Sequence, residues 1–74
     1  MREADRKKFV ELAEKRVNRA IKDIRLIGNL SNKSNYAYTD ADVKKIHGAL
    51  KVALEDMRKR FESNGGAIDD SFKL

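Results

Sequence analysis

A row of amide and cationic side chains occupies the middle of the sequence. Asn18, Lys22, Arg25 and Asn29 recur at spacings of 4, 3 and 4 residues, which places them on one face of a helix. Neither Lys22 nor Arg25 has an acidic residue four positions away on either side. Because guanidinium, ammonium and amide groups all donate hydrogen bonds, this row has the chemistry to hold a phosphate. The alternative interpretation is an ordinary solvated helix face.

The segment that follows adds more amides and two aromatic rings. Asn32 and Asn35 precede Tyr36 and Tyr38, and tyrosine rings can stack on a base while amides hydrogen-bond to its edge. In an extended stretch the two rings would alternate in direction, so we expect one buried and one exposed. Alternatively, the asparagines turn the chain and the tyrosines fill the end of a helical bundle. The candidate ligand-binding residues are Asn18, Lys22, Arg25, Asn29, Asn32, Asn35, Tyr36 and Tyr38.

Apolar residues at helical spacing predict the elements that position these side chains. We expect a helix over about 2–28, a loop over 29–39, a helix over about 40–62 and a tail over 63–74. The first helix repeats apolar residues at steps of three and four, namely Val10, Ala13, Val17, Ala20, Ile24 and Ile27. The second helix does the same with Val43, Ile46, Leu50, Ala53 or Leu54, Met57 and Phe61. Each pattern is typical of a helix that packs one face against other helices.

The sequence also predicts where the helices end and which charged side chains lie close together. Gly28 or Asn29 can take the left-handed conformation that ends a helix, and Thr39 and Asp42 have the spacing of a capping box. The second helix is expected to end in Ser63-Asn64-Gly65-Gly66. Opposite charges four residues apart support both helices: Glu3–Lys7, Lys7–Glu11, Glu11–Lys15, Arg19–Asp23, Glu55–Lys59, Asp56–Arg60 and Arg58–Glu62.

The size of the chain predicts association with further copies. A chain of 74 residues without cysteine has one thin apolar core and no disulfide to support it. Two long helices joined by a short loop most often fold back on each other. A single pair of helices leaves much of each apolar face exposed to water. We therefore expect residues 1–74 to form one all-α domain, an antiparallel helical hairpin that oligomerises into a helical bundle.

Several classes of function are disfavoured by composition. With no cysteine and one histidine, the chain lacks the donors of a thiolate or multi-histidine metal site. Glycine-rich phosphate loops and nucleophile motifs are missing from the sequence, and we interpret His47 as structural. We expect no catalysis, no metal site and no cofactor. No apolar run reaches the roughly 18 residues that span a bilayer, and the charged start does not resemble a signal peptide, so we expect a cytoplasmic protein without a membrane partner.

The central segment carries a resemblance. Its motifs Ile24-Arg-Leu-Ile-Gly-Asn-Leu-Ser-Asn32 and Asn35-Tyr36-Ala-Tyr38-Thr39, followed by Asp42-Val43, resemble a core shared by small helical proteins of bacteria, phages and plasmids. The resemblance covers about 30 to 45 residues. It implies a small helical protein and brings no activity with it.

The net charge of +5 favours an anionic partner. We expect a homo-oligomeric binding protein for an anionic, nucleotide-like ligand, held where subunits meet, for example a phage sponge that sequesters a signalling nucleotide. One alternative is a regulator that binds nucleic acid. Another is a protein-interaction module that inhibits a host or defence enzyme.

Overall fold

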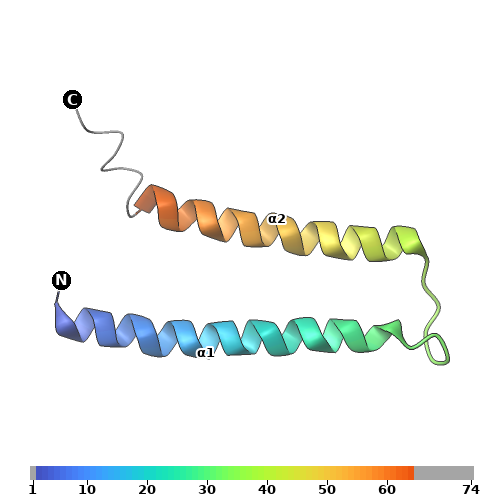
Figure 1. The fold of residues 1–74 in the computed structure, drawn as a ribbon, viewed down its shortest axis with the longest axis horizontal. Helices are drawn as coiled ribbons and strands as arrows, with labels where there is room; N and C mark the ends of the chain where they lie inside the picture. The colour runs from blue at the N-terminus through green and yellow to red at the C-terminus, as the bar shows by residue number, and fades with distance from the viewer. Residues whose placement is uncertain (1, 65–74) are drawn as a thin grey trace. The chain divides into compact units, whose positions relative to one another are not determined.

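Two long helices make up most of the chain. The computed structural model describes residues 2–64 and contains α1 (Glu3–Gly28), a short 3-10 helix η1 (Asn29–Ser31) and α2 (Asp40–Asn64) (Figure 1). Within this range there is no β-strand, so the expected all-α class is confirmed. The chain divides into two compact units, Met1–Ala37 with α1 and η1 and Tyr38–Leu74 with α2.

The C-terminal end of α1 differs from the expected one. Gly28 and Asn29 have φ angles of −61° and −65°, so the prediction that one of them is left-handed is wrong. Instead, α1 tightens directly into η1. The N–H of Asn29 faces the carbonyl oxygens of both Arg25 and Leu26, the shared bond by which an α-helix passes into a 3-10 turn. The helical path ends at Asn32, whose ψ of 102° is extended.

The N-terminal end of α2 is closed by the expected capping box. The backbone N–H of Thr39 donates to Asp42 Oδ2 at 2.9 Å, and the N–H of Asp42 donates to Thr39 Oγ1 at 3.1 Å. The two bonds satisfy donors that the first turn of a helix leaves without partners. Asp40 and Asp42 also place negative charge beside the positive end of the helix dipole. The capping prediction is therefore confirmed. Residues 65–74, with Gly65-Gly66 and most of the expected tail, lie outside the described residues.

One arginine organises the charges on the last turns of α2. Arg58 forms ion pairs with both Glu55 and Glu62. Donation from Arg58 lowers the pKa of the Glu55 carboxyl and raises the pKa of Arg58 itself. The Arg58–Glu62 pair was expected. It is the only one of the seven predicted pairs that forms an ion pair within residues 2–64. Exposed carboxylates and ammonium groups are well hydrated when apart, so four-residue spacing alone does not hold them together.

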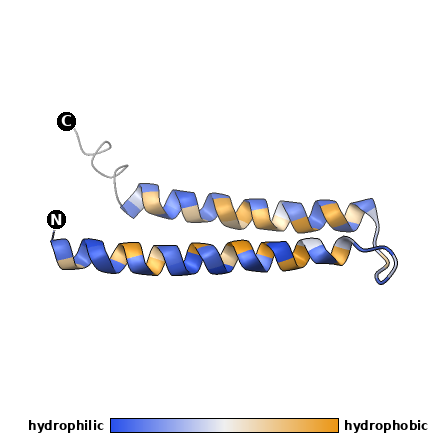
Figure 2. Cartoon of the chain, turned by 60° about the horizontal axis from the view of Figure 1, so that its bottom comes forward, coloured by the Kyte–Doolittle hydropathy of each residue, from blue (hydrophilic) through white to orange (hydrophobic). Residues whose placement is uncertain are grey.

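The apolar faces of both helices stay accessible. No described residue is buried, and Ile24 on α1 and Phe61 on α2 are 50% and 59% exposed. Orange apolar segments recur beside blue hydrophilic ones along each helix in Figure 2. Amphipathic helices draw most of their stability from packing their apolar faces, and both of these faces are accessible for such packing. Neither described helix has the apolar run required to cross a bilayer.

Candidate anion-binding site

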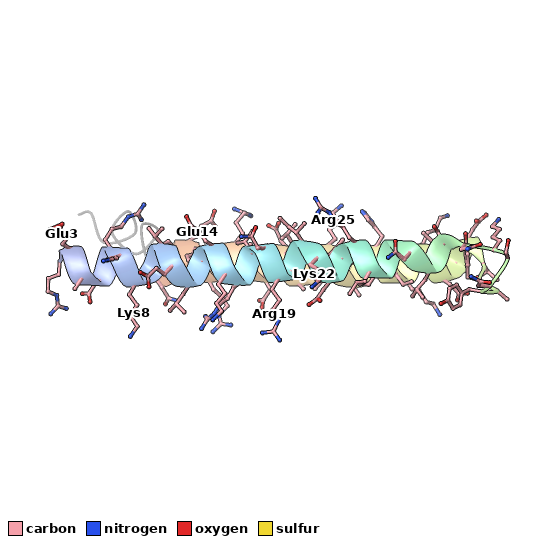
Figure 3. The ribbon with its side chains drawn as sticks, turned by 90° about the horizontal axis from the view of Figure 1, so that it is seen from below. Glu3, Lys8, Glu14, Arg19, Lys22 and Arg25 are labelled. Carbon is pink, nitrogen blue, oxygen red and sulfur yellow. The ribbon has the colours of Figure 1, made fainter. Side chains whose placement is uncertain are left out.

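Four basic side chains lie along the polar face of α1. They are spaced 4, 3 and 3 residues apart, and we call them the cationic row: Lys15, Arg19, Lys22 and Arg25. At 100° per residue all four fall within about 120° of one another around the helix. Figure 3 shows Lys22 between Arg19 and Arg25, which point to opposite sides of α1. The row therefore covers a broad face centred on Lys22, opposite most of the apolar residues of α1, with Leu26 lying on the same face as the row.

All four members of the row are exposed, and none forms an ion pair among residues 2–64. The sequence had suggested that Glu11 would pair with Lys15 and Asp23 with Arg19. The structure forms neither pair. An anion that reaches this face therefore displaces no ion-paired carboxylate from the row.

The charge around the row is more one-sided than the whole chain suggests. Residues 15–39 contain six basic residues and a single acidic one, Asp23. The net charge of this segment is +5, equal to that of the entire chain, so the remaining residues are neutral in sum. A local excess of one sign attracts anions over roughly the Debye length of about 8 Å at physiological salt. The cationic row supplies four of the six basic residues of this positively charged segment.

Two asparagines belong to the same face of unit Met1–Ala37. Asn18 falls within about 40° of Lys22 around α1, and Asn29 begins η1 one turn beyond Arg25. Both are exposed. Their amides supply donors and acceptors beside the cations, so the face could bind phosphate oxygens and neighbouring polar groups together.

Asn32 has a structural role. Its Oδ1 accepts a hydrogen bond from the N–H of Ser34 at 3.0 Å, and its carbonyl accepts from the N–H groups of Asn35 and Tyr36 at 3.1 and 3.0 Å. Asparagine side chains commonly stabilise turns in this way. For Asn32 the turn interpretation therefore fits better than ligand binding, whereas Asn35 is an exposed residue of the turn.

The turn fixes the position of Tyr36. Because its N–H bonds to the Asn32 carbonyl, the Tyr36 backbone stays beside the end of η1 instead of continuing away from α1. The Tyr36 side chain is 49% exposed. Tyr38 is half-buried and belongs to the other unit. Neither ring is buried, so the expected division into one buried and one exposed ring is not found.

Other chemistry is sparse in the described part of the chain. Residues 2–64 contain no group of three histidine, aspartate or glutamate side chains that could hold a metal ion. His47 is an exposed residue of α2. The candidate site is therefore a surface of cations and amides with an aromatic ring at one end, which is suited to binding.

The eight candidate residues predicted from the sequence do not all lie in the same part of the structure. The structure places Asn18, Lys22, Arg25 and Asn29 on one face, with Asn32, Asn35 and Tyr36 in the turn that follows, and it assigns Tyr38 to the second unit. Lys15 and Arg19 were not among the candidates predicted from the sequence, because each was expected to form an ion pair with a carboxylate four residues away. Counting charge over residues 15–39 would have found them.

Comparison with known proteins adds no relative. No family model matches the chain, and no significant match is found to a curated protein or to a solved structure.

Proposed function

We propose that the chain is a non-enzymatic, homo-oligomeric protein that binds a phosphate-bearing, nucleotide-like anion through the cationic row and its neighbouring amides. One observation carries the proposal: the row presents four exposed cations without ion pairs, in the segment that accounts for the whole net charge. Binding without turnover would sequester the ligand.

The proposal includes further copies because of the exposed apolar faces. Val17 and Ile24 on α1 are 55% and 50% exposed, and Ile46 and Met57 on α2 are 42% and 47% exposed. Complete burial of an exposed side chain of this kind contributes about 1.5–3 kcal/mol, and these half-exposed side chains would gain roughly half of that. A bundle of antiparallel hairpins would bury both faces and leave the polar face of α1 outside.

Association also helps to explain how an open surface could bind tightly. A hydrogen bond to a charged group contributes about 1.5–3 kcal/mol, so two such contacts correspond to a dissociation constant near 1 mM, or about 4 kcal/mol. If two copies each present a cationic row to one ligand, the contacts double, and the dissociation constant falls toward the micromolar range.

Calorimetry with purified protein tests this proposal. ATP, GTP and a cyclic dinucleotide are titrated into the wild type, Lys22→Gln and Arg25→Gln, with Lys51→Gln on α2 as the matched control. Lys51 is an exposed helical lysine outside the row, so its substitution makes the same charge change elsewhere. We expect binding that weakens severalfold in both row variants and is retained in the control. Absence of binding by any nucleotide at millimolar concentration would refute the proposal.

A further inference from the structure

We infer that the natural form of this anion is a single-stranded nucleic acid, whose backbone follows the cationic row and one of whose bases stacks on Tyr36. The inference rests on the proposed function and names its ligand class. It depends on three observations: the length of the row, the single acidic residue in the segment 15–39 that contains it, and the position of the exposed ring.

The row is longer than one nucleotide requires. Lys15 and Arg25 are ten residues apart, which corresponds to about 15 Å along α1. A phosphate held by two adjacent side chains, such as Lys22 and Arg25, leaves the other end of the row without an anion. A polyanion instead places successive phosphates along the helix, so that every cation of the row contributes. The geometry therefore favours a strand over a free nucleotide.

The surroundings of the row suit a strand as well. Asp23 is the single carboxylate in residues 15–39, so a backbone that runs along α1 and into the turn meets little repulsion. Nucleic-acid binding draws most of its non-specific free energy from such phosphate contacts. Charges of both signs are interleaved over the chain as a whole, but the acidic residues lie almost entirely in the segments before Lys15 and after Thr39.

Tyr36 selects for a single strand. Its ring is 49% exposed, and the hydrogen bond from its N–H to the Asn32 carbonyl holds its backbone beside the end of η1. A strand that leaves the row at Arg25 and Asn29 reaches this turn next. Stacking on an exposed aromatic ring requires an unpaired base with an open face, which a duplex does not offer within its stack.

Fluorescence anisotropy of the full chain with a labelled 20-nucleotide single strand tests the inference over a range of salt. For single strands, the logarithm of the binding constant falls with the logarithm of salt with a slope of about −0.7 per phosphate contact. Four row contacts predict a slope of about −3 per chain. Lys22→Gln should reduce this slope by about 0.7 and weaken binding, whereas Lys51→Gln should change neither.

The ring is tested separately. Replacing an aromatic residue that stacks on a base weakens binding by roughly tenfold, so we expect this loss for Tyr36→Leu. Tyr36→Phe should bind like the wild type, because the phenyl ring keeps the stacking face. Circular dichroism of each variant verifies that helicity is retained, as expected for substitutions at exposed positions.

The possible outcomes distinguish this inference from the proposed function. Equal affinity for a duplex of the same sequence, or no effect of Tyr36→Leu, would overturn the single-strand inference. Binding of free ATP or GTP that depends on Lys22, without binding of the oligonucleotide at low salt, would overturn it while leaving the proposed function in place. If neither the nucleotides nor the strand binds, both fail.

Discussion

Substitution of Gly48 tests how closely another helix approaches the polar side of α2. Gly48 lies in the interior of α2, where glycine is less favourable than alanine by about 1 kcal/mol because it loses more backbone freedom on folding. Its φ angle is not positive, and a Cβ atom added there would meet nothing within 4 Å. Gly48→Ala should therefore stabilise the protein.

The expected size of the effect follows from these facts. With no steric cost, the full helix-propensity gain of about 1 kcal/mol remains. For a chain of this size, that gain raises the melting temperature by roughly 4–8 °C. Thermal unfolding followed by circular dichroism at 222 nm measures it, at fixed protein concentration because association also raises the melting temperature. Gly28→Ala is a matched control, since Gly28 is equally open and right-handed but lies at the end of α1, where we expect a smaller gain.

A decrease in the melting temperature of Gly48→Ala would refute this reasoning. Gly48 lies on the side of α2 away from most of its apolar residues, so the mutation should not meet a packed neighbour in a bundle built on the apolar faces. A loss of stability, with a gain for Gly28→Ala, would mean that another helix approaches Gly48 closely in the assembly. The arrangement of the proposed bundle would then be wrong.

Three further predictions concern the cap, the apolar face and the charges of α2. Thr39→Ala removes the hydroxyl that accepts from the Asp42 N–H and should destabilise the protein by about 1 kcal/mol in urea unfolding, whereas Thr39→Ser should not. Ile24→Asp places a charge in the apolar face of α1 and should shift sedimentation toward monomer; unchanged mass would contradict the bundle. Arg58 lowers the pKa of the Glu55 carboxyl. The stability that this ion pair contributes is therefore complete above pH 4.5, the ordinary carboxyl pKa, and is lost as the pH falls through the lowered pKa. Glu55→Gln should remove that part of the acid-induced loss of helicity.

Most of the local architecture followed from the sequence because its causes act over a few residues. The steps of three and four between apolar residues predicted helices over about 2–28 and 40–62, and α1 and α2 span Glu3–Gly28 and Asp40–Asn64. The capping box needs only Thr39 and Asp42, three residues apart, and both of its hydrogen bonds are present.

The conformation at Gly28 required the structure. Glycine permits left-handed and right-handed backbone alike, so its presence near a helix end does not select between a left-handed cap and a 3-10 turn. Hydrogen bonding decided it, since the tightened turn satisfies carbonyls of α1 while the chain continues to Asn32. The position of Tyr36 also required the structure. It depends on a turn with three hydrogen bonds to Asn32, which the residue types alone do not predict.

The sequence by itself determined the two helices, the cap of α2 and the polar face that carries Asn18, Lys22 and Arg25, because helical periodicity and local hydrogen bonding are properties of neighbouring residues. Only the three-dimensional structure decided that Lys15 and Arg19, whose spacing places them on this face, form no ion pair with a carboxylate, and that an exposed Tyr36 stays at its end. The physical reason is that a surface ion pair competes with hydration and side-chain entropy, and a turn is selected by its complete set of hydrogen bonds.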